Sequence, residues 1–167
     1  MYASGICCPW KSDRTKLPRP PYAFSNALNF RIVGVQVPTI EELQLQPIPI
    51  IAVVDDDPGM CDAIAELVEV LDFDSARYTS PEDFLADLAD RRFDCVVSDV
   101  RMPVMDGFEL ARHLARIAPT LPVIFVSSID DETTYRNVER AGGIAFLRKP
   151  LDIDDFQRCI VQALERA

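Results

Sequence analysis

Five polar side chains lie at the ends of short, mainly apolar runs in this sequence, and together they could hold a cation and react with an anionic group. They are three carboxylates, one hydroxyl and one amine: Asp55, Asp56, Asp99, Ser127 and Lys149. Carboxylates that lie a few ångströms apart raise one another's pKa unless a cation is present. Oxygen ligands of this kind suit a hard divalent ion such as Mg²⁺, which also binds phosphate oxygens. We therefore expect Mg²⁺ as the cofactor.

Asp99 is the residue that we expect to react. A carboxylate beside Mg²⁺ and a lysine can attack a phosphoryl group and form an aspartyl phosphate. Mg²⁺ and the ammonium group of Lys149 would neutralise charge on the transferred oxygens. The Ser127 hydroxyl can donate a hydrogen bond to a phosphoryl oxygen only when that group is present. A contact made in one state alone is what a two-state switch requires.

The hydrophobic pattern from residue 48 onward predicts five strands that alternate with five helices. The runs 50–54, 95–98 and 122–126 are the most uniformly apolar, which is typical of central parallel strands, whereas 75–78 is the most polar and suits an edge. We predict an α/β fold with a five-stranded parallel sheet in the order 2-1-3-4-5 and helices on both faces. This order brings the five polar side chains together at the carboxyl edge of the sheet, beside its switch point.

Polar residues before the helices predict where those helices begin. Asp57 before Pro58 reads as a helix N-cap, Asp106 as a cap or turn residue, and Asp152 as the cap of the last helix. The helix near 131–140 has the fewest apolar residues, so we expect it to be the mobile element. The single histidine, His113, is expected on a partly exposed helix face.

Residues 1–47 differ from the rest of the chain. They contain six prolines and no sustained helical or strand period, so we predict a mostly disordered N-terminal extension followed by one domain over 48–167. The net charge of −10 disfavours direct binding to nucleic acid. No apolar run approaches the roughly 18 residues of a membrane span, and a cytoplasmic location is expected. Cys61, Cys95 and Cys159 fall in apolar segments and are expected to be buried.

Four motifs in residues 48–167 resemble the receiver domain of two-component response regulators, which has a flavodoxin-like fold. They are Val-Val-Asp-Asp-Asp at 53–57, Ser-Asp-Val-Arg-Met-Pro-Val-Met-Asp-Gly at 98–107, Val-Ser-Ser at 126–128 and Lys-Pro at 149–150. The resemblance implies that Asp99 accepts a phosphoryl group from a histidine kinase or a phosphotransfer protein. It also implies that Asp56, Asp99 and the backbone carbonyl of Arg101 ligate Mg²⁺, while Asp55 holds a metal-bound water.

The same resemblance implies roles for three further residues. Ser127 and Lys149 would contact the phosphoryl group. Phe146 falls where the family keeps an aromatic rotamer switch, although packing in the last strand explains an aromatic residue there equally well. The family resemblance leaves open a homodimer that depends on phosphorylation.

Three functions fit this pattern. In the first, the chain is a stand-alone bacterial response regulator that catalyses only its own phosphorylation and dephosphorylation. It would control a partner in a phosphorelay through the surface of the last two helices and the strand between them. In the second, the chain is the receiver half of a truncated or split transcription factor. In the third, it is a Mg²⁺-dependent phosphatase, but such enzymes usually place a second acid two residues after the nucleophile, where this chain has Arg101.

Overall fold

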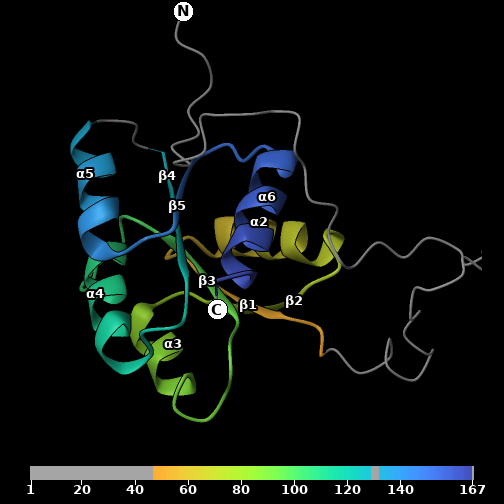
Figure 1. Cartoon of the computed structure of the whole chain (residues 1–167), viewed down its shortest axis with the longest axis horizontal. Helices are drawn as coiled ribbons and strands as arrows, with labels where there is room; N and C mark the ends of the chain where they lie inside the picture. The colour runs from red at the N-terminus through yellow and green to blue at the C-terminus, as the bar shows by residue number, and fades with distance from the viewer. Residues whose placement is uncertain (1–46, 129–131, 167) are drawn as a thin grey trace, which may run out of the picture.

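The computed structural model describes residues 47–128 and 132–166. Strands and helices alternate through these residues (Figure 1). In chain order the elements are β1 (Ile50–Val54), α2 (Pro58–Val70), β2 (Asp74–Tyr78), α3 (Pro81–Asp87), β3 (Cys95–Asp99), α4 (Gly107–Ile117), β4 (Val123–Ser127), α5 (Glu132–Ala141), β5 (Ala145–Arg148) and α6 (Ile153–Leu164). The predicted N-terminal extension lies outside the described residues, apart from residue 47.

The five strands form one parallel sheet in the order β2-β1-β3-β4-β5, which confirms the predicted topology. The predicted strands agree with the observed ones to within one residue at each end. All residues of β3 and β4 are buried, whereas β2 exposes Asp74 and Arg77 at the sheet edge. Uniformly apolar strands therefore lie in the middle of the sheet because both of their faces are covered.

Helices cover both faces of the sheet and divide the core into two clusters. On one face, α2 and α6 pack against the sheet through Ile64, Val68, Phe156 and Ile160. On the other face, α3, α4 and α5 contribute the second cluster, whose helical members include Phe84, Phe108, Leu110, Leu114 and Val138. The layers are visible in Figure 1, where α2 and α6 lie apart from α3, α4 and α5. This arrangement leaves the carboxyl edge of the sheet open.

The predicted helix caps are confirmed. The Asp57 side chain accepts hydrogen bonds from the backbone N–H groups of Gly59 and Met60, at 2.9 and 3.3 Å. Asp106 caps α4, and Asp152 caps α6 in the same manner. Each cap satisfies backbone donors that a helix leaves without an internal partner. The cysteines at 61, 95 and 159 are buried, as predicted.

Tyr78 ties the edge strand β2 to helix α3. Its hydroxyl donates a hydrogen bond to Asp87, and its ring packs edge-on against Phe84 and Phe93, with centroids 5.3 and 6.0 Å away. Burial, together with the hydrogen bond to Asp87, raises the pKa of Tyr78 to about 12. The neutral phenol is therefore the form that the folded state favours.

This contact predicts a loss of stability in alkali. Because the folded-state pKa of Tyr78 exceeds the value of about 10 for an unfolded chain, its contribution is complete below pH ~10. It is lost as the pH rises toward 12, where the folded state must release the proton. We expect the free energy of unfolding in urea to fall between pH 9 and pH 11.5. The free energy of unfolding of Tyr78→Phe should fall less over this range. An equal fall in the variant and in wild type would show that Tyr78 does not cause the loss of stability.

Candidate functional site

The register of the sheet places the predicted site residues at one edge. Asp99 is the last residue of β3 and lies opposite Val126, one residue before the end of β4. Ser127 ends β4, and its carbonyl accepts a hydrogen bond of 2.9 Å from the backbone N–H of Lys149. Asp55 directly follows β1. Four side chains from four strand ends are thus brought to the carboxyl edge, as the parallel topology requires.

Lys149 is the centre of this group. Its Nζ donates hydrogen bonds to Oδ2 of Asp55 at 2.7 Å and to Oδ1 of Asp99 at 2.6 Å. The side chains of Lys149, Asp55 and Asp99 are only 12%, 2% and 10% exposed. Charge pairs that are this well shielded from water interact more strongly than surface ion pairs. The structure therefore joins residues 94 positions apart in the sequence into one buried ionic cluster.

The other carboxylate oxygens of the cluster accept backbone hydrogen bonds. Oδ1 of Asp55 accepts from the N–H of Asp57 at 3.0 Å, and Oδ2 of Asp99 accepts from the N–H of Arg101 at 2.5 Å. These contacts hold both carboxylates in fixed orientations. They also hold the backbone of Arg101 beside Asp99, while the Arg101 residue is exposed.

Burial and the neighbouring charges act in opposite directions on the pKa of Asp99 and on the pKa of Lys149. Burial raises the pKa of Asp99, and the hydrogen bond and charge of Lys149 offset this only in part. Burial also acts to lower the pKa of Lys149, but the hydrogen bonds and charges of Asp55 and Asp99 outweigh it, so that pKa is raised. Lys149 is therefore a cation in this site at neutral pH.

Asp56 is placed differently from the other two aspartates. It is exposed, and among residues 47–128 and 132–166 it makes no hydrogen bond or ion pair. The same residues contain no trio of His, Cys, Asp or Glu side chains arranged to hold a metal. The available donors are nevertheless all hard oxygens. Three aspartates against one lysine give this edge a charge of −2, which fits a divalent cation such as Mg²⁺.

Ser127 and Phe146 are both buried, at 2% and 0% exposure. Phe146 lies opposite Phe125 in the sheet, and its ring meets the Tyr135 ring of α5 edge-on at a centroid distance of 5.1 Å. The ring therefore has a packing role beneath α5. A switching role for Phe146 and a phosphoryl contact for Ser127 remain predictions.

Gly107 is a site residue whose importance the sequence did not reveal. It starts α4 directly behind Asp99, and its N–H donates to the carbonyl of Val100 at 3.0 Å. A Cβ at this position would lie 2.2 Å from the backbone oxygen of Asp99 and 3.0 Å from Oγ of Ser98. The clash is with the backbone, so no rotation of a side chain relieves it. The Asp-Gly pair at 106–107 indicated only a helix cap and a turn.

We expect Gly107→Ala to destabilise the protein by about 3 kcal/mol, because α4 or the end of β3 must move. Gly59→Ala is the matched control in the first turn of α2. A Cβ there would meet only Oδ1 of the Asp57 side chain, at 3.3 Å. That variant should change the free energy of unfolding by less than about 1 kcal/mol. Urea unfolding at pH 7 measures the free energy of unfolding of both variants. Equal losses would show that the close approach at Gly107 does not cause the destabilisation.

Comparison with known proteins identifies the class to which this fold and site belong. Residues 51–161 match the family model described as the response regulator receiver domain. The chain therefore belongs to the response regulator receiver domain family, as its motifs predicted.

Individual relatives agree with this assignment. The chain is 33% identical to the response regulator protein TmoT of Ectopseudomonas mendocina, over 71% of this chain and 54% of that protein. It is 32% identical to the transcriptional regulatory protein FixJ of Bradyrhizobium diazoefficiens, over 70% of this chain and 57% of that protein. The chain thus spans little more than half the length of these two relatives. A response regulator receiver protein from Burkholderia phymatum matches with a TM-score of 0.64 and 37% identity, over 71% of this chain and 97% of that one.

Family membership establishes the general role of the domain. Receiver domains are signalling domains of phosphorylation-based two-component systems, and they are not generally classical enzymes. They interact with histidine kinases or phosphotransfer proteins and generally bind Mg²⁺ at the phosphorylation site. Within the part of the chain that the structure describes, no helix is long and apolar enough to cross a membrane.

Proposed function

We propose that Asp99 is the phosphoacceptor of this domain. The observation that supports this most directly is the contact of Lys149 with both Asp55 and Asp99 at the carboxyl edge of the sheet. The arrangement supplies a carboxylate to attack phosphorus and an ammonium group within reach of the same site. The donor is a phosphohistidine on a histidine kinase or a phosphotransfer protein.

The transfer involves one bond formed and one bond broken. A carboxylate oxygen of Asp99 attacks phosphorus, and the bond between phosphorus and the donor imidazole nitrogen breaks. The electron pair of that bond returns to the imidazole, and the product on this chain is an aspartyl phosphate. Lys149 stabilises the added negative charge on the phosphoryl oxygens, which requires that its hydrogen bond to Asp99 be exchanged for one to phosphate.

We propose that Asp56, Asp99 and the backbone carbonyl of Arg101 hold Mg²⁺, with Asp55 holding a metal-bound water. The chemistry that Mg²⁺ would supply there, when bound, is neutralisation of charge on the phosphoryl oxygens. The exposed position of Asp56 leaves its carboxylate oxygens accessible to an ion. Lys149 and Mg²⁺ then supply three positive charges to a site with three aspartates.

We further propose that phosphorylation changes the surface made by α5, β5 and α6, and that this surface controls a protein partner. Ser127 would turn its hydroxyl toward the phosphoryl group, and the Phe146 ring beneath α5 would adjust together with the Tyr135 ring of that helix. Helix α5 is suited to movement because Val138 and Ala141 are its only buried apolar residues in the described structure. A homodimer of phosphorylated copies through this surface is one form that the output could take.

Two contexts fit such a domain. One is a stand-alone cytoplasmic regulator that contacts a protein and not nucleic acid, in keeping with the net charge of −10. The other is the receiver part of a transcriptional regulator. One relative, FixJ, is named as a transcriptional regulatory protein, and the alignment covers only 57% of it. This partial coverage supports the context of a transcriptional regulator.

Phosphorylation by acetyl phosphate tests the proposal without a known kinase. We expect intact-protein mass spectrometry to show the addition of one phosphoryl group in the presence of Mg²⁺, and little addition with excess chelator. Reduction with borohydride followed by peptide mapping should locate the group at Asp99. Labelling at another aspartate would refute the assignment.

A further inference from the structure

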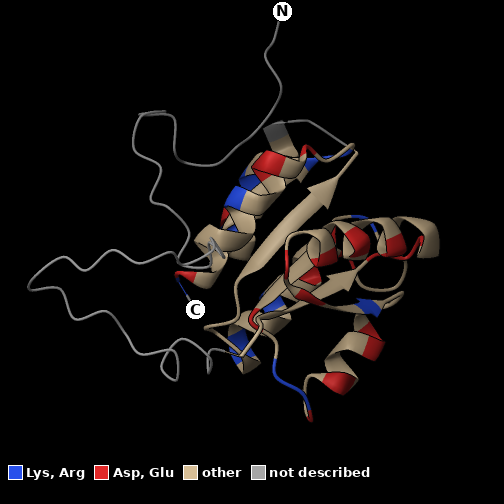
Figure 2. Ribbon diagram, turned by 90° about the vertical axis from the view of Figure 1, so that its right-hand side faces the viewer, with Lys and Arg blue, Asp and Glu red and all other residues tan. Residues whose placement is uncertain are grey.

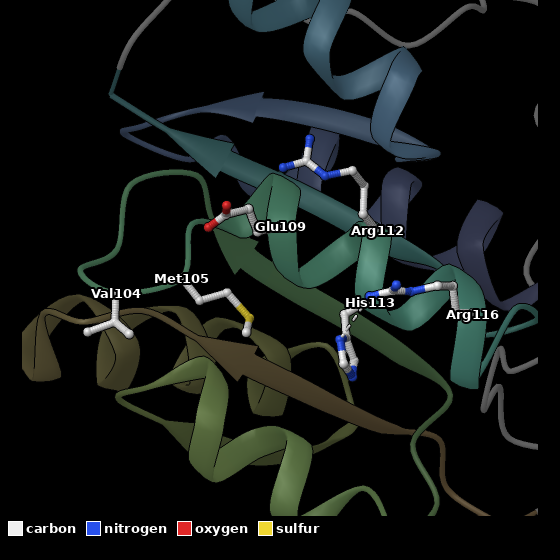
Figure 3. A pocket seen from close by; sticks show the side chains of 6 residues that line it. All are labelled: Val104, Met105, Glu109, Arg112, His113 and Arg116. Atoms are coloured by element: carbon white, nitrogen blue, oxygen red, sulfur yellow. Dashed lines mark hydrogen bonds between the residues drawn. The ribbon is translucent and has the colours of Figure 1, made fainter.

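A patch on α4 and on the loop before it lies apart from the cluster around Lys149. Six residues line a shallow, open hollow there, which we call the α4 patch: Val104, Met105, Glu109, Arg112, His113 and Arg116. Figure 3 shows that Val104 and Met105 belong to the loop after β3, whereas the other four side chains project from α4. None of these residues has a role in the proposed phosphoryl transfer.

Val104 is an unusual residue for its place in the loop. Its φ angle is +68°, in the left-handed region that β-branched residues disfavour, and its side chain is 94% exposed. An asparagine or glycine would adopt this backbone at lower cost. The valine therefore contributes neither burial nor a favourable turn conformation to the folded domain. An exposed apolar side chain kept in a strained turn is suited to contact another molecule.

The arginines of the α4 patch have no acidic partner among residues 47–128 and 132–166. Arg112 and Arg116 lie one helical turn apart and are exposed, and neither forms an ion pair with any residue that the structure describes. Glu109 forms no ion pair with Arg112 in the described structure; its carboxylate accepts the backbone N–H of Asp106 at 3.2 Å in the capping box of α4. Arg116 reaches only the ring nitrogen of His113, at 3.4 Å.

We propose that the α4 patch binds an acidic amphipathic segment of a partner protein. An apolar side chain of that segment would lie on Val104 and Met105, and carboxylates one turn apart would pair with Arg112 and Arg116. This inference goes beyond the phosphorylation proposed above and does not depend on it.

Charge complementarity favours this occupant over two others. Two arginines and one glutamate give the patch a charge of +1 in a chain whose net charge is −10. A nucleic acid duplex is a long polyanion, so it would also face the acidic remainder of the domain. Figure 2 shows acidic residues, coloured red on the ribbon, on several helices. A symmetric dimer through the patch would bring two pairs of arginines together, which is repulsive. A short acidic segment avoids both difficulties.

A designed peptide can serve as the probe. It would be a capped amphipathic helix of about four turns, with two glutamates one turn apart and a leucine one turn before them. We expect its addition to ¹⁵N-labelled protein to shift the amide signals of the α4 patch. The Arg112→Ala/Arg116→Ala variant should bind about five- to thirtyfold more weakly, as the loss of two exposed ion pairs implies. Arg92→Ala, which removes an exposed arginine elsewhere, should bind like wild type.

Two further variants separate docking from folding. Val104→Asn should raise the melting temperature, because the strain is relieved, and yet weaken peptide binding. Arg112→Glu/Arg116→Glu should lose the glutamate peptide and gain a peptide with lysines in the same places. Shifts centred on other helices, or unchanged affinity in the double alanine variant, would overturn the proposal. A concentration-dependent dimer that the double glutamate variant abolishes would overturn it as well, because the occupant would then be a second copy.

Discussion

Asp99→Asn is expected to abolish phosphorylation by acetyl phosphate and by any donor kinase. The amide replaces the carboxylate oxygen that attacks phosphorus, and it is a far weaker nucleophile. The amide oxygen can still accept the Lys149 hydrogen bond that Oδ1 of Asp99 accepts at 2.6 Å, so the fold should be preserved. We expect the initial rate to fall by at least a factor of about 10³. Intact-protein mass spectrometry after incubation with acetyl phosphate and Mg²⁺ measures the labelled fraction.

Asp57→Asn is the matched control for this experiment. Asp57 lies in the loop after β1, where its exposed carboxylate caps α2 and has no proposed part in the transfer. Asparagine is as good an N-cap as aspartate, so the control variant should fold and be labelled like wild type. Equal labelling of Asp99→Asn and wild type would show that another residue is the acceptor. Loss of labelling in both variants would show that the assay reports general damage to the loops.

Lys149→Met is expected to lower the stability of the fold strongly. It removes the cation from between Asp55 and Asp99, which are 2% and 10% exposed in their side chains. Breaking a buried ion pair from one side costs about 3 kcal/mol, because the remaining charge is left without compensation. We expect a decrease of this size in the free energy of unfolding in urea at pH 7. Arg158→Met, which breaks the pair between the 58% exposed Arg158 side chain and Asp155, should change it by less than about 0.5 kcal/mol.

The pH dependence gives the Lys149→Met prediction a second readout. Burial already raises the pKa of Asp99, and the variant removes the hydrogen bond that opposes this shift. A raised folded-state pKa means that the protonated carboxyl is favoured, so stability falls as the pH rises from about 4 toward that raised pKa. The difference in the free energy of unfolding between wild type and Lys149→Met should therefore be smaller at pH 4 than at pH 7. A difference that is constant over this range would indicate lost packing instead of an uncompensated charge.

A double-mutant cycle tests whether Lys149 acts through Asp99. In the Asp99→Asn background one of the two buried charges is gone, so Lys149→Met should cost clearly less than in wild type. A coupling of about 1–3 kcal/mol is the size expected for residues in direct contact. Additive effects would show that the 2.6 Å contact contributes little to the stability of the fold.

The sequence alone determined the order of the sheet, the strand bounds to within one residue and the caps at Asp57, Asp106 and Asp152. These features depend on hydrophobic periods and on contacts between residues a few positions apart, both of which can be read along the chain. Parallel topology then requires the strand ends to meet, so the location of the site followed as well.

Only the tertiary structure decided which atoms meet. Lys149 contacts Asp55 and Asp99, while Asp56 in the same loop is exposed, and loop geometry rather than residue type makes that difference. The need for glycine at position 107 comes from a backbone oxygen eight residues earlier, packed against it by the turn into α4. Pairings of this kind depend on the path of the backbone through space, and hydrophobic periodicity carries no information about it.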